Sequence, residues 1–236
     1  TLPGNVALAV KKNEEYVVVK TSANIALNSG KDHIFSLDFK ISPGTYIFAK
    51  DIFWKGANAS NAGIGSHTVN TLLERPSEEI VSDLVLFAKN QNEFLKKYGI
   101  EIVRGGDLVG LEYEPLYKTE GIAEHPKAHK VYAADFVTTD EGTGIVHIAT
   151  AYGEDDYEFG LKEELPVQPM LDERGHFNER APEFLRGAYF EKANKLVVQN
   201  LEEKGLMFRK ERHEHSYPHC WRCSNKLFYN AIPAWF

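Results

Sequence analysis

The stretch GTGIVHIATAYGEDDY (residues 142–157) joins two local patterns that together define a site. Gly142 and Gly144 flank a turn, and the following segment GIVHIA has the composition of a short buried strand that contains His147. Asp156 stands where a helix would begin, at the end of a helix that favours acidic side chains. Because a strand end, a loop and a helix N-terminus often line a pocket, we expect His147 and Asp156 to share one site.

Around this stretch the chain alternates irregularly between strand and helix patterns. VALAV and YVVVKT flank the polar turn KKNEE and predict a hairpin. Further strands are predicted at HIFSLDFKI, GTYIFAK, DLVGLEYEPL and KVYAADFVTT, and a glycine-rich loop at 56–66. Three helices are expected: one from Pro76 towards Tyr98, one from the acidic GEDDY to before Pro166, and one over Tyr189–Lys204.

Strands and helices in this order predict an α+β fold, with a mixed, barrel-like β-sheet core and flanking helices, and not a doubly wound parallel sheet. The tail from about residue 209 is richer in histidine, arginine and aromatic residues than the rest. We therefore expect a main domain over 1–208 and a separate exit segment over 209–236.

Composition limits the functional classes. The chain has 236 residues, 43% of them apolar and 26% charged, and no apolar run approaches the roughly 20 residues that span a bilayer. No signal peptide is predicted at the N-terminus, so we expect a cytoplasmic protein. The sequence starts and stops within a motif, so we also expect a fragment of a longer chain. The net charge of −7 argues against binding long nucleic acid through its phosphates, but allows a site for the end of a strand.

No motif in the chain indicates a protein nucleophile. A lone Gly-Thr-Gly is more often a turn than a phosphate loop, and neither nucleotide-binding fingerprint is present. Taken alone, His147 is more often a core histidine than a functional one. Neither a catalytic Ser–His–Asp set nor a zinc-protease motif occurs, so an enzymatic reaction would have to use water or a hydroxyl of the substrate.

Cys220 and Cys223 form a C-x2-C pair, which has the spacing of half a zinc site. The second pair of ligands would come from outside this chain. Two alternatives remain open: His213, His215 and His219 could complete the site, or the thiols could lie unmetallated in a hairpin.

Several motifs, in the same order along nearly the whole chain, make it resemble the editing domain of isoleucyl-tRNA synthetases. This domain is the large insertion in their catalytic domain. TLPGNVALAV is similar to the segment where the chain enters that domain, and GGDLVGLEYEPL to a motif inside it. DEGTGIVHIATAYGEDDYEFG is similar to the motif of the editing pocket. YPHCWRC and AIPAWF are similar to the segment that leads back to the catalytic domain. Valyl-type relatives usually have lysine at the position of His147 and leucyl-type ones methionine, so the resemblance favours the isoleucyl type.

The resemblance implies hydrolysis of valine attached to isoleucine tRNA, and of valyl-adenylate as a further substrate. Asp156 would hold the α-ammonium of the amino acid and His147 would line its side-chain pocket. Contacts to the amino acid and terminal adenosine are expected from Thr1, Asn5, Gly144 and Tyr152.

The resemblance also implies partners and cofactors. The partners would be the 3′ acceptor end of tRNA(Ile), the valyl group and the rest of a monomeric synthetase, with no membrane. No cofactor is expected in the editing pocket. Zinc would bind at Cys220 and Cys223, and ATP and Mg²⁺ only in the catalytic domain of the parent.

Two alternatives to isoleucyl editing remain. The domain would be a non-catalytic insertion that docks the tRNA acceptor end, or a valyl-type editing domain. Two positions depart from the family pattern: Thr150 replaces a usual proline, and Tyr152 stands where phenylalanine or histidine is common. The first substitution would loosen the loop that carries Asp156.

Overall fold

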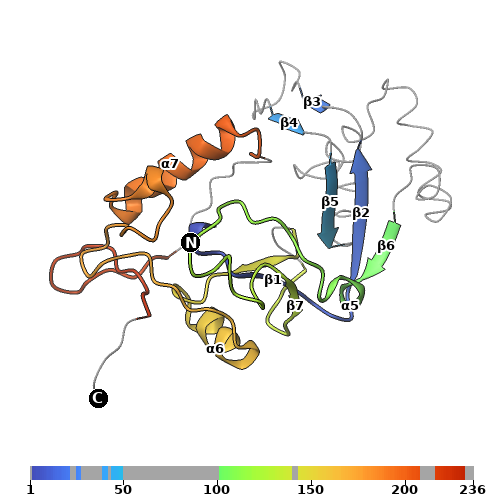
Figure 1. The fold of residues 1–236 in the computed structure, drawn as a ribbon, viewed down its shortest axis with the longest axis horizontal. Helices are drawn as coiled ribbons and strands as arrows, with labels where there is room; N and C mark the ends of the chain where they lie inside the picture. The colour runs from blue at the N-terminus through green and yellow to red at the C-terminus, as the bar shows by residue number, and fades with distance from the viewer. Residues whose placement is uncertain are drawn as a thin grey trace.

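The computed structural model describes residues 2–21, 25–27, 39–41, 44–49, 101–139, 143–207 and 216–231. Figure 1 shows two larger sheets beside each other, with the helices α6 and α7 next to the sheet that contains β1. That sheet and the loops around it hold most of the predicted site residues.

The first sheet has the strand order β7-β1-β8. Its central strand β1 (Ala7–Val10) pairs in parallel with β7 (Val131–Ala133) and antiparallel with β8 (Val146–Ile148). The register places Leu8 opposite both Val131 and His147. The mixed sheet that the sequence predicts is therefore confirmed, and β8 carries His147 beside the N-terminal strand.

The second sheet has the order β5-β2-β6, and both of its pairings are antiparallel. It consists of β5 (Gly44–Ala49), β2 (Glu15–Thr21) and β6 (Glu101–Arg104). A third sheet is made of β3 (Ile25–Leu27) and β4 (Phe39–Ile41). All three sheets are open within the described residues, so closure into a barrel stays a prediction.

The predicted hairpin of VALAV and YVVVKT is wrong. Both strands form, but β1 and β2 belong to different sheets, and each is the central strand of its own. The turn between them pairs elsewhere: Gly105 N–H donates to the Glu14 carbonyl at 2.9 Å and Gly106 N–H to the Lys12 carbonyl at 2.9 Å. Strongly apolar strands favour a position with partners on both edges, which a two-stranded hairpin does not provide.

The strand predicted at DLVGLEYEPL is also wrong. Its start forms the short helix α5 (Gly105–Leu108), and the rest is irregular except for one bridge between Glu112 and Lys130. Gly110 and Pro115 interrupt the apolar alternation that a ladder needs. The predicted strand at GTYIFAK is confirmed by β5, and KVYAADFVTT is strand only at Val131–Ala133. Of HIFSLDFKI, the described part, Phe39–Ile41, is strand, and the rest lies outside the described residues.

Two of the predicted helices are confirmed. Helix α6 (Glu154–Glu163) begins after Gly153 and is terminated by Glu164, whose φ of 56° lies in the left-handed region. Helix α7 (Phe190–Glu203) buries Ala193, Val197 and Leu201, which are spaced four residues apart on one face. Two short 3-10 turns lie at Leu2–Gly4 (η1) and Glu183–Leu185 (η2). The helix predicted from Pro76 and the loop at 56–66 lie outside the described residues.

The main core joins the first sheet to both helices. It is formed by side chains of β1, β8, α6, α7 and the loops between them, including Val6, Ile148, Phe159, Met170 and Leu185. None of the described helices is long and apolar enough to cross a membrane. The 209–236 boundary falls among residues that the structure leaves undescribed, so the separate exit segment stays a prediction.

Candidate functional site

His147 lies on β8, and its ring contacts the N-terminal segment. The Nδ1 atom of His147 is 3.3 Å from Nδ2 of Asn5. The ring is largely buried, and this burial lowers the pKa of His147 to about 4, so the imidazole is neutral at pH 7. A neutral ring next to a pocket can donate or accept a hydrogen bond without repelling a cationic substrate.

Asp156 lies in the first turn of α6, and its carboxylate turns back towards β8. The Ala149 N–H donates to Asp156 Oδ2 at 2.9 Å, one residue beyond the end of the strand that carries His147. Burial raises the pKa of the Asp156 carboxyl above its ordinary value, and the bond from Ala149 acts against that rise. A partly buried carboxylate of this kind favours a cationic partner, which would lower its pKa again.

The loop between His147 and Asp156 is tightly held. Thr150 is buried, and its hydroxyl donates to the Pro166 carbonyl at 2.6 Å. Gly160 of α6 allows this approach, because a Cβ there would lie 2.3 Å from the Thr150 methyl group. The expected loosening by Thr150 is therefore not observed, since its hydroxyl anchors the loop to the segment that follows α6.

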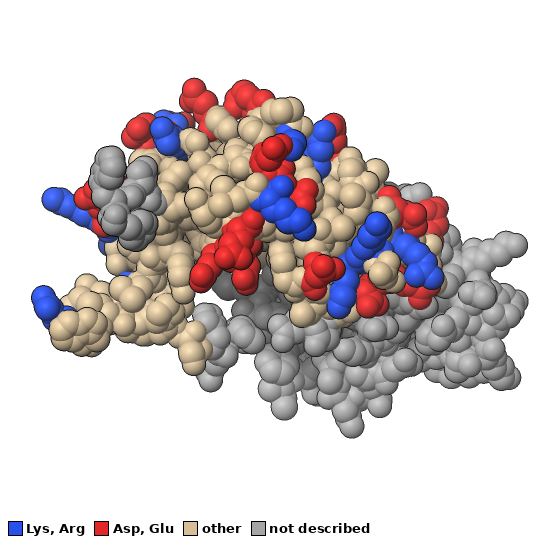
Figure 2. Space-filling view, turned by 90° about the horizontal axis from the view of Figure 1, so that it is seen from below, with Lys and Arg blue, Asp and Glu red and all other residues tan. Residues whose placement is uncertain are grey.

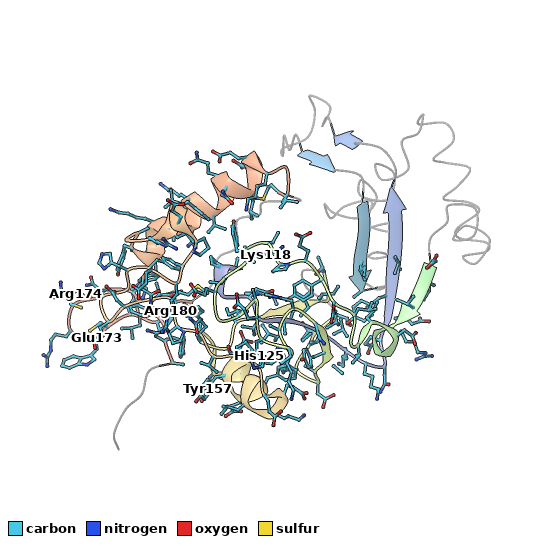
Figure 3. All side chains as sticks on the ribbon, viewed as in Figure 1. Lys118, His125, Tyr157, Glu173, Arg174 and Arg180 are labelled. Carbon is cyan, nitrogen blue, oxygen red and sulfur yellow. The ribbon has the colours of Figure 1, made fainter. Side chains whose placement is uncertain are left out.

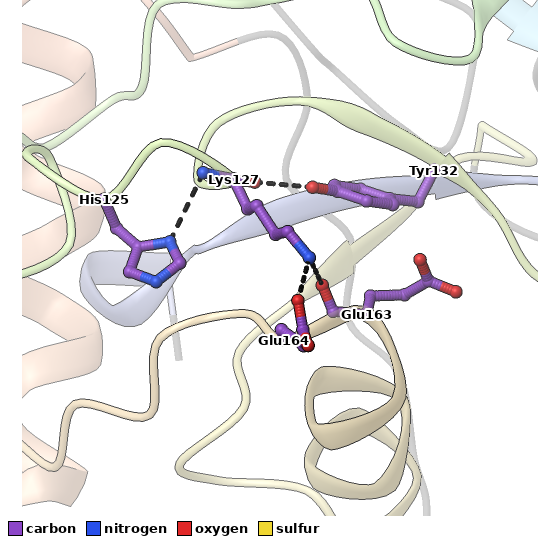
Figure 4. Close-up of polar contacts among 5 residues, drawn as sticks. All are labelled: His125, Lys127, Tyr132, Glu163 and Glu164. Atoms are coloured by element: carbon purple, nitrogen blue, oxygen red, sulfur yellow. Dashed lines mark hydrogen bonds and ion pairs between the residues drawn. The ribbon is translucent and has the colours of Figure 1, made fainter.

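The structure ties the far end of α6 to the loop before β7 (Figure 4). Lys127 Nζ donates to the Glu163 carbonyl at 3.2 Å and pairs with the Glu164 carboxylate. The Tyr132 hydroxyl donates to the Lys127 carbonyl at 2.7 Å. These contacts fix the helix that carries Asp156 against the strand β7 next to β1. Figure 3 shows His125 of the same loop above α6.

Asn5 follows η1, and Tyr152 lies in the loop before α6; both belong to this region. Asn5 Nδ2 donates to the Ala7 carbonyl at 2.9 Å as well as facing His147. The Tyr152 hydroxyl accepts the Met170 N–H at 2.7 Å, and the Tyr152 ring packs over Gly4, where a Cβ would lie 2.8 Å from it. Burial raises the pKa of Tyr152 to about 12. The structure thus brings Asn5 and His147 into contact and packs Tyr152 against the residue before Asn5.

Gly144 lies at the junction of the two larger sheets. Its carbonyl accepts the Tyr16 hydroxyl at 2.9 Å, and a Cβ at its φ of +70° would lie 2.3 Å from the Ala49 Cβ. The Ala49 N–H donates to the Thr143 carbonyl at 2.7 Å. Gly144 has a structural role in joining β2 and β5 to the segment before β8, and its contact with substrate stays a prediction. Thr1 lies outside the described residues.

Two site neighbours, Tyr113 and His129, were not predicted from the sequence. The Tyr113 hydroxyl donates to Asn5 Oδ1, and the Tyr113 ring meets His129 edge to face at 5.8 Å between centroids. Burial raises the pKa of Tyr113 and lowers the pKa of His129. His129 Nε2 is buried and has no hydrogen-bond partner in the structure. The only sequence signal was the tyrosine in GLEYEPL, which gave no indication of its partner.

Cys220 and Cys223 lie in a turn of the tail. The backbone N–H groups of Cys223 and Arg222 bond to the Cys220 sulfur and lower its pKa, which favours the thiolate that a metal needs. A turn that directs N–H groups at a cysteine sulfur fits half of a zinc site. Within the described residues, no group of three histidine, cysteine or acidic side chains could hold a metal. His213 and His215 lie outside them.

The described surface carries charged side chains of both signs (Figure 2). On the described part of the face in Figure 2, acidic and basic side chains are interspersed. Several of the described charges form ion pairs, such as Lys226 with Glu191 at 2.8 Å and Lys130 with Glu112 at 3.2 Å.

No protein-family model matches the chain. Among curated proteins, it is 34% identical over 235 residues to an isoleucine–tRNA ligase of Bacillus thuringiensis, which covers 100% of this chain and 17% of that protein. It is 39% identical over 172 residues to the enzyme of Aquifex pyrophilus, with 67% of this chain and 32% of that protein covered. The chain therefore spans between about a sixth and a third of these relatives.

Solved structures give the fold. The editing domain of the P. falciparum cytosolic leucyl-tRNA synthetase superposes with a TM-score of 0.51 at 13% identity, over 90% of this chain and 76% of that one. The P. knowlesi counterpart gives 0.50 at 11% identity, over 87% and 78%. Along its whole length, the chain is thus related to a segment of isoleucyl-tRNA synthetases, and it has the fold of a synthetase editing domain.

Proposed function

We propose that the chain edits isoleucine aminoacylation by hydrolysing valine from mischarged Val-tRNA(Ile). Asp156 binds the α-ammonium of the valyl group, and His147 limits the volume available to its side chain. The observation that carries this proposal is the bond from Ala149 to Asp156, which holds a partly buried carboxylate at the end of the strand of His147.

The reaction that this site supports is attack by water on the ester. The sequence contains no nucleophile motif, and the neutral His147 and the Asp156 carboxylate bind and orient the amino acid. Ester hydrolysis then needs a positioned water and stabilisation of the developing oxyanion. Valyl-adenylate presents the same ammonium and side chain, so the same residues would bind it.

A second site is needed because one pocket discriminates poorly between these amino acids. Removing one methylene changes binding by only about 1–3 kcal/mol, a range for which isoleucyl-tRNA synthetase is itself the standard example. An editing site that is too small for isoleucine removes valine and leaves the correct product intact.

The role of Asp156 is tested in the complete parent synthetase by deacylation of Val-tRNA(Ile). We expect Asp156→Ala to lower kcat/KM by roughly 100-fold or more, because it removes the carboxylate that is proposed to pair with the ammonium. Asp155→Ala is the matched control, since Asp155 is exposed in the same helical turn. Retained valine clearance in Asp156→Ala would exclude the assigned role.

The role of His147 is tested with the correct product. A smaller side chain enlarges the pocket, so His147→Ala should raise deacylation of Ile-tRNA(Ile) by roughly tenfold or more. If Ile-tRNA(Ile) stays fully resistant, the proposed steric role of His147 is wrong. A domain that only docks the acceptor end would hydrolyse neither substrate, which separates that alternative from editing.

A further inference from the structure

The contacts of Asn5 fix which way its side-chain amide points. Its Nδ2 atom is 2.9 Å from the Ala7 carbonyl oxygen, which can only accept a hydrogen bond. Its Oδ1 atom receives the Tyr113 hydroxyl. Rotating the amide by 180° would place two oxygens against each other at Ala7. The NH₂ group must therefore face both Ala7 and His147.

This orientation determines the state of the His147 ring. An NH₂ group has no acceptor, so the Nδ1 atom of His147 at 3.3 Å from it must carry a lone pair. A neutral imidazole with a lone pair on Nδ1 has its proton on Nε2. The imidazolium form would place two donors against each other, and the burial that lowers the His147 pKa also acts against this form.

Tyr113 supplies the outer end of this chain of contacts. Its hydroxyl donates to Asn5, and burial keeps that hydroxyl protonated by raising its pKa. The position of Tyr113 is itself fixed, because its N–H donates to the His129 carbonyl at 3.0 Å and its ring packs edge to face on His129. Three segments that are distant in sequence therefore meet at one amide.

We propose that Tyr113 is a positioning residue: its hydroxyl orients the Asn5 amide, and that amide holds His147 as the neutral tautomer with its proton on Nε2. His147 then presents a hydrogen-bond donor on the side of its ring away from Asn5. The value of this donor for editing rests on the proposed function, whereas the tautomer itself does not.

The tautomer is measured directly by long-range ¹H–¹⁵N correlation spectra of the 236-residue chain with labelled histidines. The chain contains 9 histidines, and the signals that disappear in His147→Gln identify those of His147. We expect the proton on Nε2 in the unmodified chain. A proton on Nδ1, or an equal mixture of both tautomers, would overturn the proposal.

Two variants test the residues that impose this state. In Asn5→Asp the carboxylate can only accept, so Nδ1 of His147 should gain a proton; an unchanged Nε2–H tautomer would overturn the role of Asn5. In Tyr113→Phe the amide loses one of its anchors, and the minor tautomer should increase roughly fivefold. A spectrum identical to that of the unmodified chain would exclude Tyr113 as a positioning residue.

Tyr117→Phe is the matched control, because the Tyr117 hydroxyl also donates to an asparagine side chain, Asn200, at 3.2 Å. It should leave the His147 signals unchanged. If Tyr113→Phe does not fold, the unmodified chain and the Asn5→Asp variant still decide whether His147 carries its proton on Nε2 and whether the Asn5 amide imposes that tautomer. If the 236-residue chain has the Nε2–H tautomer but the complete synthetase does not deacylate Val-tRNA(Ile), the proposed function is refuted and the positioning role is not. Normal deacylation with the other tautomer would refute the positioning alone.

Discussion

His147 and Asp156 have pKa shifts of opposite sign, and both shifts favour binding of an ammonium group. Burial lowers the pKa of His147 to about 4 and raises that of Asp156. Above pH 5 the ring is neutral, so the only charge offered by this pair is the carboxylate. A buried imidazolium would instead repel the cation that the carboxylate is proposed to bind.

The buried ring should make stability depend on pH. Between pH 6.5 and 4 the unfolded chain protonates this histidine and the folded chain does not, so stability is lost as pH falls through this range. We expect His147 to account for about 2 kcal/mol of the loss between pH 7 and 4.5. Urea unfolding of the unmodified chain and of His147→Gln at both pH values measures this contribution.

The control for this measurement is His125→Gln, because His125 lies in the loop over α6, away from β8, and its ring accepts the Lys127 N–H at 3.3 Å. It should leave the contribution assigned to His147 unchanged. An equal loss of stability in the His147→Gln variant and the unmodified chain would show that the ring is already protonated, or accessible, in the folded state.

Among the elements, the junction at Gly144 joins the two larger sheets. We expect Gly144→Ala to lower the free energy of unfolding by about 2–4 kcal/mol, because it adds both a strained φ and a clash with Ala49. Gly110→Ala is the matched control: Gly110 has a φ of +86° but nothing within 4 Å of its Cβ position. It should cost only about 1 kcal/mol.

Chemical denaturation of both variants gives the two values. The difference between them isolates the contact with Ala49, since the backbone strain is common to both. Equal losses at the two positions would mean that β5 shifts freely away from Gly144, and that the junction does not hold the sheets together.

The sequence predicted elements better than it predicted their partners. Strand β8, the start of α6 and the extent of α7 follow from apolar periodicity, acidic residues at a helix start and a terminal glycine. The pairing of β1 with β7 and β8 has no local signal, because strand partners are chosen by burial across the whole domain. His147 and Asp156 are close in the sequence, so a shared site could be predicted for them. Tyr113 and Asn5 are far apart in the sequence, and no local signal predicted their contact.

For the whole molecule, the tail presents a thiol pair with no further ligands among the described residues. We expect the 236-residue chain to hold less than about one tenth of an equivalent of zinc after dialysis, because a structural site needs four ligands. A longer chain that supplies a second cysteine pair should hold one equivalent, which Cys220→Ser removes. Native mass spectrometry measures both.

Stoichiometric zinc in the 236-residue chain would mean that the site is completed internally, by the histidines at 213, 215 or 219. Binding that survives Cys220→Ser would place the metal elsewhere. The exposed Trp221 between the two cysteines provides a fluorescence signal for the same titration.

The register of β1 has a consequence for biosynthesis. Leu8 is paired with Val131 on one edge and with His147 on the other, so neither neighbour exists while the ribosome has reached only residue 100. At a translation rate of about 5–20 residues per second, β7, the first strand that pairs with the apolar segment VALAV, is synthesised roughly 6–25 s after it. During that interval VALAV is an unpaired, aggregation-prone strand. Nascent chains released before residue 131 should therefore depend on chaperones far more than those released after residue 148.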